Sequence, residues 1–537
     1  MRFTTICAVS VIGALSACAD NPTTTVAPMQ PSAVVVTAAD PMSKVNRLSP
    51  SLENKVQLFK ADLASRGYAI ARGYWALWGA EDCKFPLQSI GLCYGNNPTA
   101  PYVLAVIPQW QDEFSDQRMH HGISAFQRNM NAIYRLDPQE ALVVAAELPP
   151  PARYFGIQSN VFSRETALNP NDIVFKNPFL DSVMHGILFR TLPDPTRVMT
   201  IASIGNSINN VVMTQQTGQE WQAGQQRFFV ITPDADVADS VTAALLRAGV
   251  SSANDIFVEK VSPDLVKVGL DKSSDDMITY IRYAMPNDVD AGNEWRANLP
   301  LAVFRVRDMS GSRPANPFTV PAYDQRNWNF DETVLSADLD SLASAVRSYW
   351  SQPSAPSFRS LSLYTFVDLV GQHCLGFPNP ARGPMNCLGD TQDTDYQISP
   401  SMSLDSGHVV AVLGTLATET GNATYVSLSV NWFPALVGVR NIDDDRLDGT
   451  ATRFASALQN DASLFYVHYI ARDCSGLENC TEVSKQAVAV GEVIKVIQRN
   501  YVTPGYARGP DPAKLLNPVS IILDGTTRPG ALVRKRR

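Results

Sequence analysis

Apolar and polar residues follow two periods along this chain, and together they predict a β-rich α+β fold. Apolar residues recur with helical spacing over 52–66, 339–350 and 485–501, which predicts three helices. Runs rich in Val, Ile, Tyr and Phe alternate with Gly and Pro turns, which predicts antiparallel strands. Because such strands must bury one face, we expect the sheets to pack in a sandwich-like way.

The predicted elements occur twice in the same order. Each series begins with a helix, continues through a pair of cysteines and a tyrosine, and ends in paired strands. Tyr102 and Tyr396 each follow the second cysteine of their pair by nine residues, and we expect both to anchor the following turn. We therefore predict two tandem, diverged copies of a helix-plus-antiparallel-strand unit. The matched segments are 74–78 with 361–370, 141–147 with 408–413, 152–161 with 423–430, 203–206 with 447–450, and 227–231 with 464–468.

The two copies are unequal, because the first contains an additional helical pattern and three strand-like runs. These elements predict a small α+β insert. Closely spaced prolines then indicate a boundary between the halves, and a cleft between them is where we expect a ligand. The expected division is 42–309 for the first half including the insert 234–307, 310–330 for a linker, 331–509 for the second half and 510–537 for a C-terminal tail.

The composition is acidic and typical of a folded globular protein. The chain has 44 Lys plus Arg and 52 Asp plus Glu, a net charge of −8, which argues against a nucleic-acid partner. The basic cluster 534–537 is predicted to be a solvated tail. With 45% apolar residues and 537 residues in total, we expect at least two domains.

Six of the eight cysteines form three close pairs, which predicts three local disulfides and an oxidising compartment. Zinc ligation is the alternative. It is disfavoured because no pair has the two-residue spacing of a zinc knuckle and no pair of histidines completes a ligand set. The predicted pairs are Cys83 with Cys93, Cys374 with Cys387, and Cys474 with Cys480.

The first residues are Arg2, a short apolar run over 6–14, and the sequence Leu-Ser-Ala-Cys ending at Cys18. This order resembles the signal peptide of bacterial lipoproteins, which implies cleavage of residues 1–17 and acylation of Cys18. The apolar run is too short to remain as a membrane-spanning helix. The alternative is an ordinary secretory signal with an unmodified Cys18.

Residues 18–41 are rich in Pro, Thr, Ala and Val, which predicts a flexible tether after the lipid anchor. Cleavage would remove Arg2 and leave 43 basic against 52 acidic residues, a net charge of −9. In lipoproteins of this kind, a non-acidic residue after the acylated cysteine favours the outer membrane, and Ala19 holds that position. We therefore expect a lipid-anchored body that is periplasmic or surface-exposed.

Arg153 and Tyr154 are the first candidate ligand-binding residues. They lie on a predicted strand after three prolines, where an arginine facing a cleft could bind a carboxylate or sugar acid and an aromatic ring could stack on the ligand. The structural alternative, which the sequence favours, is an outward-facing strand position.

Asp390, Asp393 and Asp395 are the second set of candidates. Their spacing would let carboxylates converge in a loop, so calcium is a candidate ligand, although a distal Glu is missing. The favoured alternative is a solvated turn. The same applies to the acidic run 443–448.

No common catalytic motif is present in the sequence, whether nucleophile elbow, phosphate loop or zinc-binding helix. We predict no cofactor other than this calcium candidate. The favoured hypothesis is an envelope lipoprotein that binds a polysaccharide, peptide or envelope protein, or serves a structural role, through a cleft or surface between two halves. The alternative is an extracytoplasmic hydrolase of an envelope polymer or ester with a dispersed active site. The sequence does not decide whether the protein is an enzyme.

Overall fold

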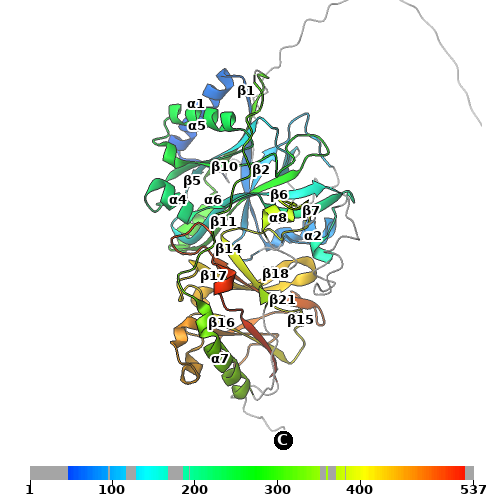
Figure 1. Ribbon diagram of the computed structural model, residues 1–537, viewed down its shortest axis with the longest axis vertical. Coiled ribbons are helices and arrows are strands. Elements are labelled where there is room, and N and C mark those ends of the chain that lie inside the picture. The colour runs from blue at the N-terminus through cyan, green and yellow to red at the C-terminus, as the bar shows by residue number, and fades with distance from the viewer. Residues whose placement is uncertain are drawn as a thin grey trace, which may run out of the picture. The chain divides into compact units, whose positions relative to one another are not determined.

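The computed structural model has an α+β fold rich in strands, as the apolar pattern predicts (Figure 1). The described residues belong to one compact unit, Ala38–Arg537. The predicted signal peptide 1–17, Cys18, the tether 18–41 and the end of the tail lie outside the described residues. The structure describes residues 46–94, 97–116, 129–166, 186–192, 194–311, 313–350, 359–360, 370–380 and 383–525.

The first half begins with helix α1, which Ser49 caps by accepting a hydrogen bond from the Leu52 amide. Helices α1 and α5 cover one face of a sheet with the order β10-β9-β5-β12-β1 (Figure 1). Phe59, Val241 and Phe304 belong to the core between them. All neighbouring strands are antiparallel except β9 and β10. The bounds are α1 Pro50–Ser65, α5 Ala235–Arg247, β1 Tyr68–Trp78, β5 Glu140–Glu147, β9 Gln226–Thr232, β10 Ile256–Lys260 and β12 Leu301–Asp308.

Strand β1 connects two parts of the large sheet of the first half. Its residues 68–73 pair with β12 and its residues 74–78 pair with β2. At Gly73 a Cβ would lie 2.3 Å from the carbonyl oxygen of Val106, so the close approach of the strands requires glycine. The sheet therefore curls and continues in the order β1-β2-β11-β6-β7. The bounds are β2 Tyr102–Pro108, β6 Ala152–Glu165, β7 Arg197–Ser203 and β11 Asp276–Pro286, with short strands β3 Met130–Asn131, β4 Ile133–Tyr134 and β8 Ile208–Asn209.

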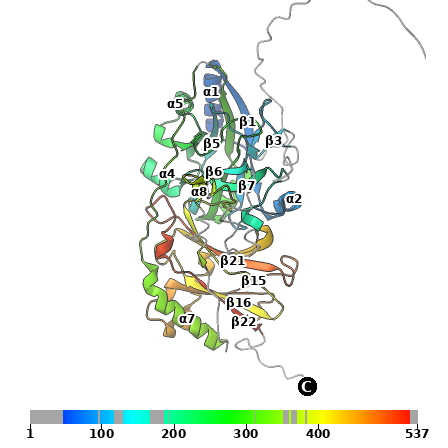
Figure 2. The same ribbon diagram turned by 45° about the vertical axis from the view of Figure 1, so that its right-hand side comes forward.

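The second half has a helix layer on two packed sheets. Helix α7 lies beside β16 and covers a sheet with the order β20-β19-β16-β22, where Leu342 packs with Val409 and Phe465 (Figure 2). The other face of that sheet packs on a sheet with the order β13-β14-β21-β17-β18 through a core that includes Val412 and Val496. The bounds are α7 Ser336–Tyr349, β13 Arg359–Ser360, β14 Thr394–Ile398, β15 Met402–Ser403, β16 His408–Thr415, β17 Tyr425–Trp432, β18 Val437–Asp443, β19 Phe465–Ala471, β20 Cys480–Glu482, β21 Val493–Tyr501 and β22 Val519–Asp524.

The segment 234–307 is not a separate insert, which corrects the sequence-based expectation. Strand β11 lies between β2 and β6, and β12 lies between β5 and β1, so both are central strands of the first half. Their partners precede them by more than a hundred residues in several places, and local periodicity carries no information on such pairings. Four further short helices connect the strands: α2 Lys84–Ser89, α4 Asn210–Thr217, α6 Val289–Asn298 and α8 Gly371–Cys374.

Two other expectations are corrected near the C-terminus. The helix predicted over 485–501 is instead strand β21, whose apolar run Val493, Ile494, Val496 and Ile497 sits between β14 and β17. A short apolar run fits a buried strand as well as a helix, and the neighbouring strands decide. The segment 510–537, expected as a C-terminal tail, contains strand β22, which pairs with β16 along its length; the basic cluster 534–537 lies outside the described residues. None of the helices within the described ranges is long and apolar enough to cross a membrane.

Candidate functional site

The three predicted disulfides are confirmed. Their cysteines lie only 6 to 13 residues apart in sequence, which is why spacing alone identified the partners. Such bonds persist in oxidising compartments, so they favour a body outside the cytoplasm. The bonds join Cys83 to Cys93, Cys374 to Cys387, and Cys474 to Cys480.

Two of the disulfide loops pack on the opposite half, and we call them the exchanged loops. The first comprises residues 83–101 and contacts the second half beside β18. There the Cys93 amide donates to the Ala435 carbonyl at 2.7 Å, and the Thr99 hydroxyl donates to Asp443 at 3.0 Å. The first half therefore contributes a loop to the edge of the second half.

The second exchanged loop comprises residues 374–393 and contacts the first half beside β7. The Cys387 amide donates to the Thr200 carbonyl at 2.6 Å, and the Asn386 amide donates to the Leu188 carbonyl at 2.7 Å. Because each half covers an edge strand of the other, both contribute to the region where they meet.

Tyr154 and Asp393, two predicted ligand candidates from opposite halves, meet in this region. The Tyr154 hydroxyl lies 3.3 Å from an Asp393 carboxylate oxygen, Asn209 Nδ2 donates to Asp393 at 3.1 Å, and the Thr391 hydroxyl donates as well. Both candidates are fully buried, and burial raises the pKa of Asp393. Their polar atoms satisfy one another, so this pair ties the halves together.

Asp390 holds the second exchanged loop against β7. Its carboxylate accepts hydrogen bonds from the Ser203 amide at 2.8 Å, the Ser203 hydroxyl, the Gly371 amide at 3.0 Å and Gln392 Nε2 at 2.7 Å. Burial raises the pKa of Asp390 to about 6 despite these donors.

The acidic run is not a solvated turn, which corrects the favoured expectation. Asp390, Asp393 and Asp395 are all buried, and burial raises the pKa of Asp395 to about 6. The first two carboxylates have separate sets of partners. Within the part of the chain that the structure describes, no three His, Cys, Asp or Glu side chains are grouped to hold a metal ion.

Arg153 bridges the two halves at the surface. Its guanidinium lies 2.5 Å from the carboxylate of Asp444, and its side chain is 42% exposed while that of Asp444 is 1% exposed. The predicted ligand-binding residue Arg153 is therefore already paired with the carboxylate of Asp444. Burial raises the pKa of Asp444, which also accepts from the Val426 amide.

Arg282 of β11 is a buried cation with incomplete hydrogen bonding. It is 2% exposed, its Nη2 donates to the Tyr102 hydroxyl at 2.8 Å, and its Cζ lies 4.8 Å from the ring centroid of the same tyrosine. Its Nε and Nη1 have no hydrogen-bond partner, and neither do the buried hydroxyls of Tyr396 and Tyr501. Buried polar groups are normally paired, so this cluster is unusual.

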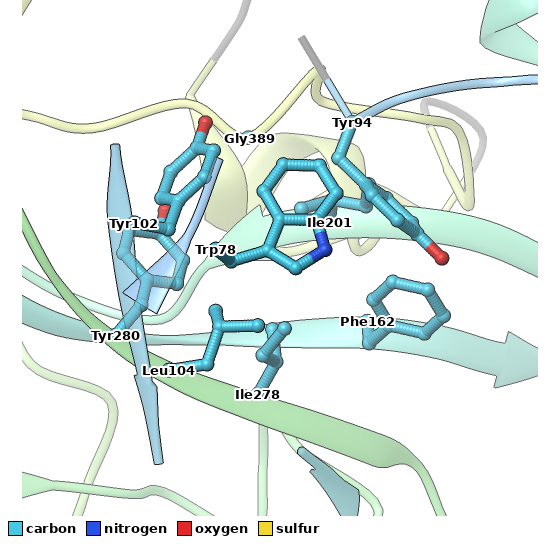
Figure 3. A pocket seen from close by; sticks show the side chains of 9 residues that line it. All are labelled: Trp78, Tyr94, Tyr102, Leu104, Phe162, Ile201, Ile278, Tyr280 and Gly389. Atoms are coloured by element: carbon cyan, nitrogen blue, oxygen red, sulfur yellow. The ribbon is translucent and has the colours of Figure 1, made fainter. Parts of the chain in front are cut away.

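An aromatic cavity lies against Tyr102, the hydrogen-bond partner of Arg282, as Figure 3 shows. Its space of about 30 Å³ has room for about two water molecules or a small apolar group. Most of the wall comes from β1, β2, β6, β7 and β11 of the first half, and Gly389 of the second exchanged loop closes one side. The lining residues are Trp78, Tyr94, Tyr102, Leu104, Phe162, Ile201, Ile278, Tyr280 and Gly389.

Sequence reasoning missed Arg282 and most of the cavity wall. It singled out Tyr102 and Tyr396 only as turn anchors. The one available signal for Arg282 was a charged residue inside an otherwise apolar strand, Asp276–Pro286. The cavity gave no signal, because its lining residues are spread over five strands and two loops.

Comparisons with known proteins add no function. No protein-family model matches this sequence, and no curated protein matches it. Among solved structures, the chain is similar to an uncharacterized protein from Burkholderia cenocepacia, with 10% sequence identity, 91% of each chain covered and a TM-score of 0.36. A likeness this distant carries no conclusion about what the chain does.

Proposed function

We propose that the chain is a cell-envelope lipoprotein whose body binds a small ligand where its two β-rich halves meet. The observation that carries the binding function is the aromatic cavity beside the buried Arg282, in a region to which both halves contribute. A concave, mostly apolar site with a few polar groups at its edge is typical of small-molecule binding. The envelope location is supported by the lipoprotein-type segment ending at Cys18 and by the three disulfides.

The proposal includes an internal duplication of the body. Its first support is strand order: β10-β9-β5-β12 matches β20-β19-β16-β22, and β2-β11-β6-β7 matches β14-β21-β17-β18. The sense of pairing agrees as well, since only β9 with β10 and β19 with β20 are parallel. Two unrelated halves would rarely share both features.

Register is the second support for duplication. Tyr102 pairs with Arg282, and Tyr396 pairs with Arg499. The exchanged loops add a third support, because each reaches the edge strand of the other half. Identical residues stand at five corresponding positions: Tyr102 and Tyr396, Arg282 and Arg499, Tyr154 and Tyr425, Asn160 and Asn431, and Phe162 and Phe433.

Binding is favoured over hydrolysis by the state of the buried carboxylates. Asp390 accepts four hydrogen bonds, and Asp393 is held by Tyr154, Asn209 and Thr391. A general acid or base must be able to reach a substrate or a water molecule. These groups already serve the contact between the halves, so the hydrolase hypothesis gains no support from them.

The lipid anchor is tested by mass spectrometry of the mature N-terminus after expression of the full chain in a bacterial host. We expect Cys18 as the first residue, carrying acyl chains, and we place the protein in the outer membrane because Ala19 follows it. The Cys18→Ser variant should move from the membrane to the soluble fraction. An intact Met1, or cleavage at another bond with an unmodified Cys18, would contradict the anchor.

Ligand binding is tested by thermal shift on the exported chain carrying Cys18→Ser, with short-chain carboxylates, amides, alcohols and monosaccharides as probes. A binder raises the unfolding temperature in a concentration-dependent manner. Ile278→Phe adds side-chain volume at the cavity wall, so it should fill the cavity and abolish the shift. The control is Lys495→Met, at the corresponding position of the second half, which should leave the shift unchanged. A shift that survives in Ile278→Phe would place the ligand elsewhere.

A further inference from the structure

We infer that Arg282, Tyr396 and Tyr501 form an internal site for the carboxylate group of a small organic acid, whose apolar part enters the aromatic cavity. The inference deepens the ligand-binding part of the proposed function and rests on it. It is carried by the unpaired, buried hydrogen-bonding groups of Arg282, Tyr396 and Tyr501. Tyr102, which accepts a hydrogen bond from Arg282, also lines the cavity.

The cation itself is the first element of the site. Arg282 is permanently charged, and its side chain is buried in the sheet between β2 and β6. No ion pair joins it to a carboxylate in the described parts of the chain, and its hydrogen-bond partner is the neutral hydroxyl of Tyr102. A buried charge without a counterion is costly unless another group pairs with it.

The two hydroxyls are the second element. Tyr396 belongs to β14 and Tyr501 to β21, so the second half supplies both. The ring centroid of Tyr501 lies 4.6 Å from that of Tyr154 on β6, the strand next to β11, and Arg282 of β11 interacts electrostatically with both Tyr396 and Tyr501. A hydroxyl can donate to a carboxylate oxygen, as the guanidinium Nε and Nη1 can. Four unpaired donors therefore come from three side chains.

A second buried arginine reinforces the positive charge. Arg499 is the register neighbour of Tyr396, is 3% exposed, and has an unpaired Nε, while its Nη1 donates to Ser429. Like Arg282, it forms no ion pair with any carboxylate of the described chain. Two buried cations thus flank Tyr396, which favours an anion and disfavours a quaternary ammonium ion in the aromatic cavity.

Asp393 carries a carboxylate that interacts electrostatically with Arg282 without forming an ion pair. Its carboxylate is already satisfied by Tyr154, Asn209 and Thr391. Burial also raises the pKa of Asp393, which weakens its value as a counterion. An incoming carboxylate would complete the charge balance of this region.

The cavity supplies the apolar contact. Tyr102 stacks under the Arg282 guanidinium on one side and meets the edge of Tyr280 at a centroid distance of 5.0 Å. Both tyrosines then face the space lined by Trp78 and Phe162 (Figure 3). Since a carboxylate is planar and matches the guanidinium geometry, a short acid with its tail toward Phe162 uses both parts of the site.

The test uses the exported Cys18→Ser chain with acetate and butyrate, each compared with its uncharged amide at constant ionic strength. We expect the acids to raise the unfolding temperature more than the amides, and butyrate to exceed acetate. Arg282→Gln should weaken acid binding by at least tenfold and abolish the difference between acid and amide. The control Arg153→Gln, which removes an exposed arginine, should preserve that difference.

Tyr396→Phe and Tyr501→Phe keep the test decisive if Arg282→Gln fails to fold, because each removes only a hydroxyl. Either should weaken acid binding about tenfold and leave amide binding unchanged. Equal binding of acid and amide to the unmodified protein would overturn the carboxylate site while leaving cavity binding intact. Absence of any binder would remove the proposed binding function as a whole. Equal shifts from chloride and butyrate would instead assign the cluster to inorganic anions and overturn the inference.

Discussion

The two halves share strand order and register, yet the aromatic cavity lies among the strands of the first. Ile278 pairs with Asn160 in the first half, and Lys495 pairs with Asn431 at the corresponding place in the second. Lys495 is buried, and its Nζ lies 5.0 Å from the ring centroid of Phe433. A long side chain therefore occupies the position where the first half leaves space. The backbone layout sets where a site can form, and single side chains decide whether it does.

The halves also differ in the layer beneath their helices. Arg305 of β12 pairs with Leu142, whereas Ser520 of β22 pairs with Val412 at the corresponding register. Arg305 is fully buried and forms ion pairs with Glu113 and Glu140. The first half thus stabilises its curled sheet with a buried ionic network, and the second uses a small hydroxyl there. The following predictions probe these differences, from the largest expected effect to the smallest.

Loss of the Arg305 network should have the largest effect. Arg305→Met leaves Glu113 and Glu140 buried without their cation, so we expect the free energy of unfolding to fall by about 3–5 kcal/mol. Ser520→Ala, the control in the second half, should cost about 1 kcal/mol or less. Urea unfolding measures both. Equal losses of unfolding free energy would mean that the Arg305 network stabilises the first half no more than the Ser520 hydroxyl stabilises the second.

Removing the disulfides tests whether the exchanged loops are equivalent. Replacing either exchanged-loop pair by serines should lower the free energy of unfolding by about 2–4 kcal/mol, and the two losses should agree to within about 0.3 kcal/mol. The shorter Cys474–Cys480 loop should cost about 0.7 kcal/mol less than Cys374–Cys387 by the chain-entropy relation. A much larger loss of stability for one exchanged loop would show that this loop contributes more to the contact between the halves than the other.

One buried titratable group in each half, Glu259 in the first and His468 in the second, should contribute to stability with opposite pH dependence. In the first half, burial raises the pKa of Glu259 to about 7, although Ser159 donates to it from its amide and hydroxyl. Between about pH 4.5 and 7 the folded state therefore holds a proton that the unfolded chain has released. The free energy of unfolding should fall as pH rises through this window, by up to about 1.4 kcal/mol per pH unit.

His468 of the second half should act in the opposite direction. Burial lowers its pKa to about 3, and its Nε2 lies 2.9 Å from the Thr481 hydroxyl. Between about pH 6.5 and 3 the unfolded chain binds the proton, so this contribution to stability is lost as pH falls. Urea unfolding at several pH values, with Glu259→Gln and His468→Gln compared with the parent, should give difference curves of opposite slope. Slopes of the same sign would refute the contrast.

The cavity contrast should give the smallest change in stability. Ile278→Phe adds volume beside the empty space and should raise the free energy of unfolding by about 0.5–1 kcal/mol. Lys495→Met keeps the chain length where no space is left and should change it by about 1 kcal/mol or less. Differential scanning calorimetry without ligand measures both. A clear loss for Ile278→Phe would indicate that the space is too narrow for the larger side chain.

Local features of the fold were predictable, and long-range ones were not. The spacing between Cys374 and Cys387 identified their disulfide, because a short loop brings its ends together at little entropic cost. The order of strands β5, β6 and β9 could be matched to β16, β17 and β19 from their apolar runs. The segment 234–307 was misassigned because β11 and β12 return to strands formed much earlier in the chain.

The candidate site follows the same division. Tyr154 and Asp393 stood out in the sequence. They are 239 residues apart, so their mutual hydrogen bond depends on how the two halves pack. Asp390 looked like part of an exposed turn because polar residues surround it in sequence. Its burial comes from β7, which lies far away along the chain and supplies Ser203 as a donor.

The sequence by itself determined that the fold is α+β and rich in strands and which cysteines join, because both depend mainly on neighbours along the chain. Only the tertiary structure decided that Arg282 is buried beside Tyr102 and that distant strands and the second exchanged loop enclose the aromatic cavity. Whether a side chain is buried, and whether its donors find partners, depends on strands that are distant in sequence. No periodicity or motif along one strand specifies which residues the neighbouring strands supply.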